Sequence, residues 1–391
     1  MVLCIKFHFS PAPAAAIFLS AVIILSCFTD LIPFKSYINF PSASYLSSAP
    51  VPPKCDIFRG EWVPDPHSPQ YTNETCSYIQ ANQNCMFYGR PDLEFLKWRW
   101  KPDGCDLPRF DPHKFLQIVG NKTLAFVGDS LSRNHYQSLI CLLSQVESPK
   151  NLAGTGSLYD LNKIMYFEGY NFTIYIFWTP FLVRTEKDAD NPGASRLYLD
   201  EADDKWLSAV PRFDYVLLSA ANWFTTATYF YERGQLVGGQ FVALNFTSNL
   251  TNRYSHRMAF RTALRALNGI GFRGKVIVRT LTPVSHFEGG PWNDGGDCPR
   301  TRPYQANETA QMNDMERDFY TGQVEEFKDA AARGLDVALM DPTAAMLMRP
   351  DGHPSRYGHW PNEKLQNDCI HWCLPGPIDA WNDMLLHILS D

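Results

Sequence analysis

The pattern of apolar and polar positions changes near residue 119. From there to the C-terminus, short apolar runs alternate with longer amphipathic stretches, which predict strands and helices respectively. The expected strands are 123–127, 173–178, 215–219, 275–280 and 336–341. The expected helices are 131–143, 253–267, 310–333 and 377–389. This alternation predicts an α/β fold of three layers, an open, mostly parallel sheet with helices on both faces.

The first half-hundred residues follow a different pattern. Residues 12–28 carry no charge, and Leu31 and Ile32 extend the apolar run. We expect a cytosolic tail at 1–11 and a signal-anchor transmembrane helix at 12–32, with a cleaved signal peptide as the alternative. A proline- and serine-rich stem at 33–54 and a cysteine-rich N-terminal lobe at 55–118 follow, before a catalytic domain at 119–391.

Composition narrows the class of protein. The chain has 391 residues, of which 45% are hydrophobic, enough for a sizeable core. Its net charge of −6 and scattered basic residues give no electrostatic case for nucleic-acid binding.

Cysteines and sequons indicate a secretory compartment. Two of the ten cysteines, Cys4 and Cys27, belong to the N-terminal segment, and an even set of eight remains for disulfides. Eight cysteines allow 105 pairings, so their number alone selects none. The candidate N-glycosylation sites are Asn73, Asn121, Asn171, Asn245, Asn249 and Asn307.

Two short motifs carry the candidate chemistry. Ser130 ends a Gly-Asp-Ser tripeptide between an expected strand and an expected helix, so its hydroxyl lies at a helix N-terminus. Asp368 and His371 form an Asp-x-x-His motif near the C-terminus. The three types supply a nucleophile, a base and a group that orients the base, in the order of a Ser-His-Asp acyl-transfer site. The alternatives are that Gly-Asp-Ser is an ordinary turn and that His371 is a packed core histidine.

A metal site is the competing interpretation of the C-terminal motif. Asp368, Cys369, His371 and Cys373 are all ligand types. In an oxidising compartment the two cysteines are expected in disulfides, so we predict no metal. The chain also lacks the spacing of a phosphate-binding loop.

Longer strings carry a family resemblance. FVGDSLSRNH at 126–135, GGDC at 295–298, DCIHWCLPG at 368–376 and CDIFRGEWV at 55–63 resemble the plant trichome-birefringence-like family. The Gly-Asp-Ser and Asp-x-x-His pair is similar to the wider SGNH (GDSL-type) superfamily. The resemblance implies an SGNH-like fold and a Golgi polysaccharide O-acetyltransferase.

The resemblance also assigns further residues. It implies oxyanion donors beyond the Ser130 N–H, for which we take Asn222, although Ala220 and Trp223 depart from the superfamily's Gly-x-Asn-Asp. Arg133 is a second candidate, with a solvated helix position as the alternative. Asn134 and His135 are placed on the pocket rim or the helix surface. The implied disulfides are Cys55–Cys105, Cys76–Cys141, Cys85–Cys373 and Cys298–Cys369.

Aromatic residues near these motifs are candidate sugar contacts, because aromatic rings pack on the apolar faces of sugars. One or two of four tryptophans are expected to act so: Trp223, Trp292, Trp360 and Trp372. The glycine-rich segment 286–296, which begins at His286, is a candidate substrate loop.

The sequence therefore predicts a single-pass type II Golgi membrane enzyme with its catalytic domain in the lumen. It would transfer acetyl groups to a cell-wall polysaccharide, by resemblance xyloglucan side-chain galactose. Xylan or mannan acetylation, an acetylesterase, and a non-catalytic glycan-binding protein are the alternatives. No bound cofactor is expected, but an acetyl donor is required, and Golgi proteins that supply this donor are the expected partners besides the polysaccharide.

Overall fold

The structure, a computed structural model, describes residues 55–153, 162–283, 286–305, 308 and 311–390. The expected tail, signal anchor and stem (1–11, 12–32 and 33–54) lie outside these residues, as does the sequon at Asn307. Among the described helices, none is both long enough and apolar enough to span a bilayer.

The centre of the fold is a seven-stranded sheet with the order β13-β12-β9-β3-β6-β5-β4. Its parallel strands are Thr123–Gly128 (β3), Phe172–Trp178 (β6), Tyr215–Ser219 (β9), Lys275–Arg279 (β12) and Val337–Met340 (β13). Lys163–Phe167 (β5) and Lys150–Asn151 (β4) extend the sheet beyond β6 as an antiparallel edge.

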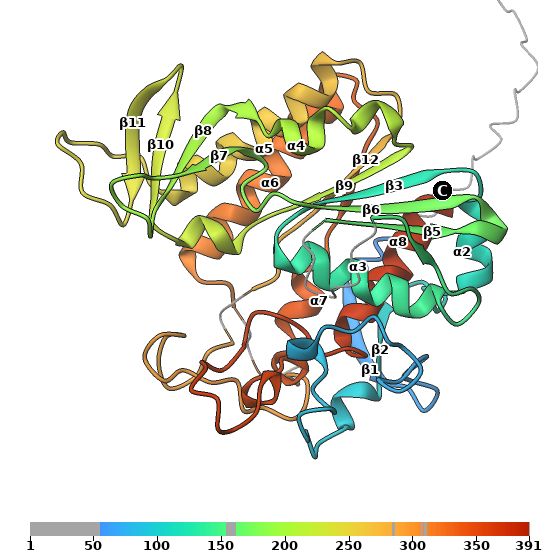
Figure 1. The fold of residues 1–391 in the computed structure, drawn as a ribbon. Coiled ribbons are helices and arrows are strands. Elements are labelled where there is room, and N and C mark those ends of the chain that lie inside the picture. Colours follow the sequence, from blue (N-terminus) through green and yellow to red (C-terminus); the bar gives the residue numbers. More distant parts are fainter. Residues whose placement is uncertain (1–54, 154–161, 284–285, 306–307, 309–310, 391) are drawn as a thin grey trace, which may run out of the picture. The chain divides into compact units, whose positions relative to one another are not determined.

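Alternate side chains of each strand enter two separate cores, because successive strand residues point to opposite faces. Leu124 and Phe126 of β3 belong to one core, and Ala125 and Val127 to the other. The first core is covered by Pro112–Ile118 (α2), Ser130–Leu143 (α3) and Ala380–Ser390 (α8). The second is covered by Asp204–Leu207 (α4), Asn252–Gly269 (α5) and Asp314–Ala332 (α6), as Figure 1 shows.

The predicted α/β fold is confirmed: the five expected strands and the four expected helices are all present. The start of the third helix was predicted too early. Asn313 accepts a hydrogen bond from the Glu316 N–H, and the Glu316 carboxylate accepts from the Asn313 N–H. This capping box begins α6 at Asp314.

A second sheet was not predicted. It has the order β11-β10-β8-β7 and comprises Val183–Lys187 (β7), Ser195–Ala202 (β8), Thr228–Glu232 (β10) and Gln235–Gln240 (β11). Leu197 and Leu199 of β8 and Phe230 of β10 are buried in the second core, and β8 lies against α5. The alternation of apolar and polar residues in β8 is the sequence signal for this sheet.

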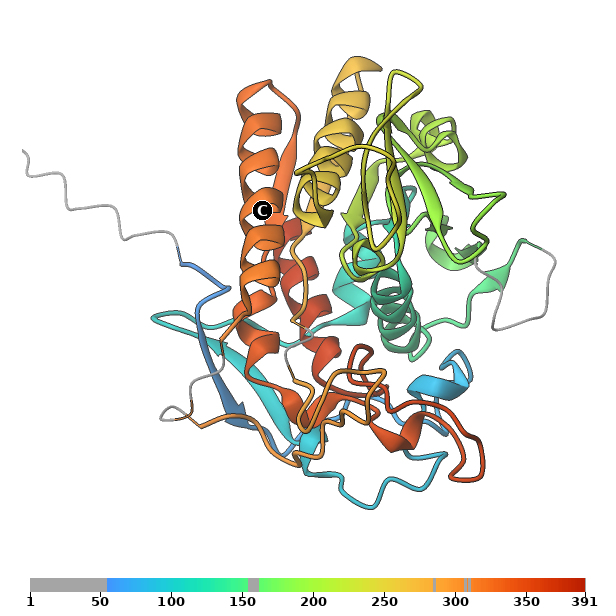
Figure 2. The same cartoon turned by 90° about the vertical axis from the view of Figure 1, so that its left-hand side faces the viewer.

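The cysteine-rich N-terminal segment contains regular secondary structure. Gly60–Pro64 (β1) pairs antiparallel with Trp98–Pro102 (β2), and α2 follows. Trp62 of β1 is buried in the first core and donates from Nε1 to the carbonyl of Ala345, 2.7 Å away, in Thr343–Leu347 (α7). Figure 2 shows this blue segment beside the red C-terminal segment.

Four disulfides tie distant parts of the chain together, and they are the four that the resemblance implied. They are Cys55–Cys105, Cys76–Cys141, Cys85–Cys373 and Cys298–Cys369. Cys369 and Cys373 lie on either side of His371, so both flanks of the C-terminal motif are covalently held.

Candidate active site

Ser130 lies at the turn from β3 to α3, at the carboxyl edge of the sheet. Gly128 comes so close to β9 that a Cβ there would overlap the carbonyl of Ser219, so only glycine fits. Asp129 is the N-cap of α3, and its Oδ1 accepts from the N–H groups of Leu131 (3.0 Å) and Ser132 (3.4 Å). The preceding N–H, that of Ser130, lies at the positive end of the helix.

Asp129 also joins this turn to the end of β9. Its Oδ2 accepts from the Ala221 N–H at 3.0 Å, which fixes the residue just before Asn222. Asn222 begins the short 3₁₀ helix Asn222–Thr225 (η5), and its Nδ2 is buried without a hydrogen-bond partner among the described residues. Asp129 is therefore more than a helix cap, because one carboxylate sets the spacing between Ser130 and Asn222.

A buried arginine, Arg279, is hydrogen-bonded both to the start of α3 and to the end of β9. Arg279 ends β12 and donates to the Leu131 carbonyl (3.2 Å) and the Ser219 hydroxyl (2.5 Å). Its guanidinium lies 4.1 Å from the Trp381 ring centre. Burial lowers the pKa of Arg279 to about 9, partly offset by Asp129, so the group stays charged at neutral pH.

Asp368 and His371 form a hydrogen-bonded pair. The Nδ1 of His371 lies 2.7 Å from Asp368 Oδ2, while Asp368 Oδ1 accepts from the N–H groups of Ile370 and His371. Burial opposes ionisation of Asp368, but the bonds from His371 outweigh it and hold the Asp368 pKa at about 2. Burial likewise opposes charge on His371, yet Asp368 raises its pKa above the usual value. The other ring nitrogen, Nε2, has no hydrogen-bond partner among the described residues.

Helix α3 is hydrogen-bonded to the segment that carries His371, the candidate base. Asn134 lies one turn after Ser130 and is fully buried, where it accepts from the Trp372 N–H (2.8 Å) and donates to the Trp372 carbonyl (3.2 Å). Ser355 pairs with Asp368 in an antiparallel bridge on the other side of the segment. The helix that carries the serine thus fixes the backbone next to the histidine.

Replacing Asn134 by alanine is expected to lower kcat by about 10- to 100-fold with KM little changed, because a shift of the base by a fraction of an ångström is enough to weaken proton transfer. The measurement is steady-state acetyl transfer beside thermal unfolding. Asn134→Asp is the matched control, since it keeps the acceptor for the Trp372 N–H and loses the donor. Equal kcat in wild type and Asn134→Ala would contradict this role.

Ser130 and His371 open into one cleft of about 960 Å³. Most of its other lining residues are aromatic or polar side chains: Arg133, Trp178, Asn222, Trp223, Thr225, Thr226, Phe287 and Trp292, and the aliphatic Ile370 also lines it. The Arg133 guanidinium lies 5.2 Å from the ring centre of Trp178, and burial lowers its pKa. This cleft is large enough for several sugar rings and is lined in the manner of a ligand site.

The cleft brings together most of the predicted site residues. Arg133, Asn222, Trp223 and Trp292 all line it, so Arg133 is not a solvated helix residue. Trp178 was missed, although it ends an expected strand at the same edge of the sheet as Ser130. Phe287 lies in the cleft lining within segment 286–296, which was expected to form a substrate loop, and Ile370 lies inside the Asp-x-x-His motif, although neither was named as a contact.

Some predicted positions were wrong. His286 is only 2% exposed and lies outside the cleft lining, so it does not offer a substrate contact there. Asn134 and His135 are fully buried rather than at a rim or a helix surface. Trp372 is buried, and Trp360 packs against Phe87 and Tyr88 away from the cleft lining.

The cysteines of the alternative metal site are both bonded. Cys369 and Cys373 belong to different disulfides, so neither offers a thiolate. The same holds for Cys298, which lies with Asp297 and Cys369 in a second group of ligand types.

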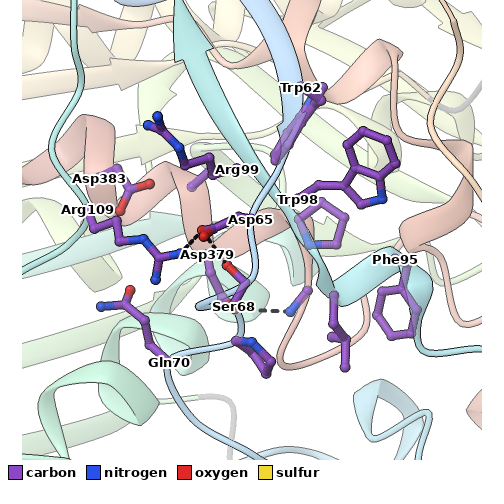
Figure 3. A pocket seen from close by; sticks show the side chains of 15 residues that line it. Trp62, Asp65, Ser68, Gln70, Phe95, Trp98, Arg99, Arg109, Asp379 and Asp383 are labelled. Carbon is purple, nitrogen blue, oxygen red and sulfur yellow. Dashed lines mark hydrogen bonds and ion pairs between the residues drawn. The ribbon is translucent and has the colours of Figure 1, made fainter.

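A smaller cavity of about 50 Å³ lies beside α8 and is lined by several charged groups. Figure 3 shows Asp379 and Asp383 near Arg109, which pairs with Asp65. Asp379 accepts from the Tyr71 hydroxyl (2.8 Å) and from Ser138 of α3, and Asp383 accepts from the Phe110 N–H (2.7 Å). Burial raises the pKa of Asp379 to about 6 and of Asp383 to about 7. The cavity has room for water rather than a substrate.

The partly buried Asp383 is expected to destabilise the fold at alkaline pH. Because its folded pKa is raised, its proton favours the folded state at low pH, and stability falls as pH rises from about 4 to about 7. Asp383→Asn keeps an acceptor for Phe110 without a charge, so it should raise the free energy of unfolding at pH 8 by about 2 kcal/mol. Urea unfolding at pH 5 and pH 8 measures this, with the exposed Asp190→Asn as control; a gain that is equal at both values would refute the assignment.

These features define a class. A parallel sheet with Gly-Asp-Ser at a strand end, facing an Asp-x-x-His histidine across a cleft, is the arrangement expected of SGNH-type acyl esterases and acyltransferases. Residues 107–388 match the family described as GDSL/SGNH-like acyl-esterases found in Pmr5 and Cas1p, and residues 53–106 match the PMR5 N-terminal domain. The chain therefore belongs to this acyl-esterase family, in its plant trichome-birefringence-like branch.

Several named relatives are similar over most of their length. The chain is 51% identical to protein trichome birefringence-like 19 of Arabidopsis thaliana over 86% of this chain and 81% of that one. It is 40% identical to xyloglucan O-acetyltransferase 2 of Arabidopsis thaliana, over 95% and 92% respectively. It is 44% identical to xyloglucan O-acetyltransferase 4 of Populus trichocarpa, over 86% and 81%.

Proposed function

We propose that this protein is a polysaccharide O-acetyltransferase that works through an acetyl-serine intermediate on Ser130. The observation that carries the proposal is the shared cleft of Ser130 and His371, with Nδ1 of His371 bound to Asp368. Asp368 keeps the neutral imidazole protonated at Nδ1, so Nε2 is the nitrogen that can accept a proton.

The reaction proceeds in two transfers. Ser130 Oγ attacks the carbonyl carbon of the acetyl donor while His371 Nε2 takes the hydroxyl proton, and the donor's leaving group departs with that proton. A sugar hydroxyl then attacks the acetyl-serine, gives its proton to His371, and releases Ser130 as the proton returns to Oγ. Asp368 stabilises the imidazolium in both steps.

The negative charge on the carbonyl oxygen needs donors in each step. The Ser130 N–H at the start of α3 and the Nδ2 of Asn222 are the two we assign. Asn222 meets the requirement because the residue lines the cleft and its side-chain amide nitrogen is buried without a partner among the described residues.

Asn222→Ala should therefore lower kcat by about 10²- to 10³-fold while leaving the fold intact. Asn222→Asp is the matched variant: it keeps the shape, loses the donor and adds a charge that repels the oxyanion, so it should be at least as impaired. Steady-state rates of both variants measure this. Full activity in Asn222→Asp would contradict an oxyanion role for this residue.

Transfer rather than hydrolysis requires the acceptor sugar to exclude water from the acetyl-serine. The aromatic side chains of Trp178, Trp223 and Trp292 along the cleft fit the apolar faces of a sugar chain. The exposed Trp292, 56% accessible, lies at the cleft and offers a stacking face for a sugar.

We place the acceptor among the xyloglucans, at side-chain galactose, and the protein in the Golgi membrane with its catalytic part in the lumen. The names of the similar Arabidopsis and Populus enzymes support this acceptor class. The acetyl donor and the proteins that deliver it belong to the same proposal.

The test is mass spectrometry of the full chain incubated with an acetyl donor and defined oligosaccharides of xyloglucan, xylan and mannan. Acetyl gain on xyloglucan alone supports the whole proposal, and gain on another glycan keeps the transferase but changes its acceptor. Acetate release without an acetylated acceptor would identify an acetylesterase. Binding of a glycan with neither product would favour a non-catalytic glycan-binding protein.

A further inference from the structure

A row of buried hydrogen bonds runs from the backbone of His371 to two other histidines. His353 Nδ1 lies 2.7 Å from the His371 carbonyl oxygen, and His353 Nε2 lies 2.7 Å from His286 Nδ1. His286 Nε2 lies 2.9 Å from the Leu347 carbonyl oxygen. Both rings are at most 2% exposed, so water does not supply missing donors.

Two neutral imidazole rings carry two N–H protons, but this row contains three hydrogen bonds and needs three protons. A carbonyl only accepts, so His353 places its N–H at Nδ1 and His286 places its N–H at Nε2. The nitrogens left over, His353 Nε2 and His286 Nδ1, would then face each other as two lone pairs at hydrogen-bond distance. A third proton between them turns this repulsion into a hydrogen bond.

A metal ion does not fit between these two nitrogens. Two imidazoles on a tetrahedral zinc, with Zn–N bonds of about 2.0 to 2.1 Å, place their nitrogens about 3.3 Å apart. The distance of 2.7 Å is that of a nitrogen–nitrogen hydrogen bond.

Burial opposes positive charge here, so the extra proton is held by the hydrogen bond between the two rings, and a second extra proton is not expected. Burial lowers the pKa of both rings, and for His353 the neighbouring His286 lowers it further. The charged and titratable groups around the pair are Asp351, Glu288, Asp368, Arg300, His371 and Arg90, whose guanidinium donates to the His353 carbonyl at 2.8 Å. The ionised Asp368 supplies a negative charge close to the pair, whereas the charge of Asp351 is matched by its ion pair with Arg349. The Trp372 ring stacks on His353 with centres 4.1 Å apart and holds its plane.

We propose that His286 and His353 share one proton and act together as a positioning pair for the base, His371. This inference rests on the proposed function only where it calls His371 the base. The pair holds the His371 carbonyl through His353, and its positive charge opposes a second positive charge on the His371 ring. The pair therefore keeps His371 in the form that accepts a proton.

The direct test is ¹⁵N NMR of histidine side chains in the full chain labelled with ¹⁵N-histidine. We expect one strongly deshielded proton coupled to both His286 and His353, lost in a single titration step as pH rises, with a coincident change in the His371 signals. Two neutral rings with one proton each over the whole pH range, and no shared proton, would overturn the proposal.

His286→Phe supplies a second measurement. It removes the facing nitrogen, so His353 stays neutral with its proton at Nδ1, and the pKa of His371 should rise by about 0.5 to 1 unit because a nearby positive charge is gone. The matched control is His135→Phe, which changes another fully buried histidine, packed between Phe126 and Trp381. An unchanged His371 titration in folded His286→Phe would count against the pair.

The NMR readout separates this inference from the proposed function. A shared proton coupled to His371 in a chain that transfers no acetyl group would leave the pair standing and refute the transferase. Acetyl transfer by a chain without a shared proton would refute the pair and leave the transferase standing.

Discussion

Ser130→Ala is expected to lower acetyl transfer by at least about 10⁴-fold and to abolish the acetyl-enzyme, while the unfolding temperature stays within error of wild type. The hydroxyl is the only group on this side chain that can carry the acetyl group. Alanine is a good first-turn residue, and Asp129 still caps α3. Intact-protein mass spectrometry after rapid quenching measures the adduct, and initial rates measure the loss.

Ser132→Ala is the matched control for this prediction. Ser132 follows two residues later on α3, and its hydroxyl is fully buried without a hydrogen-bond partner among the described residues. Removing it should leave both the adduct and the rate near wild type. If Ser130→Ala retained the adduct, another nucleophile would carry the acetyl group and the assignment of Ser130 would fail.

The sheet and its main helices were predictable because each has a local signal. The middle residues of β3, β9 and β12 are continuously apolar, as expected for strands buried on both faces. The second sheet was missed because β10 and β11 are rich in polar and aromatic residues and few of their side chains are buried, chiefly Phe230 in the second core. Such burial depends on the tertiary arrangement and leaves little periodicity in the sequence.

In the candidate site, too, the residues with a local sequence signal were predicted and the long-range contacts were not. Ser130, Asp368 and His371 were predicted from short motifs, since neighbouring residues supply their chemistry. The contacts that hold them were not predicted: Asn134 meets Trp372, 238 residues away. No property of Asn134 in its own helix distinguishes this role from a surface position. His286 was assigned to the substrate because its segment is glycine-rich, but the fold places its ring against His353 instead.

Asp368→Asn should lower kcat by about 10³- to 10⁴-fold, because the asparagine NH₂ group would face His371 Nδ1 as a donor where the carboxylate oxygen is an acceptor. The Oδ1 of asparagine can still accept from the N–H groups of Ile370 and His371, so the loop keeps its shape. Its NH₂ group then donates to His371 Nδ1, which forces the ring proton onto Nε2, the atom that must accept the proton from Ser130. Asp297→Asn is the control, because the Asp297 carboxylate lies in the same region and accepts hydrogen bonds from the Ser355 hydroxyl and the Cys298 N–H.

The residual activity of Asp368→Asn should show which group sets the acid limb of the pH profile. In the wild type, burial opposes the charge on His371, but Asp368 outweighs it and raises the His371 pKa, so activity is lost as pH falls through this raised value. Without the carboxylate, burial and the nearby Arg133 oppose the charge on His371 and outweigh the weaker effect of Asp129, so the His371 pKa falls below its usual range. The acid limb should then move to lower pH, whereas the limb of Asp297→Asn should stay in place. A limb that does not move in Asp368→Asn would mean that a group other than His371 loses its function at low pH, and His371 would no longer be the base.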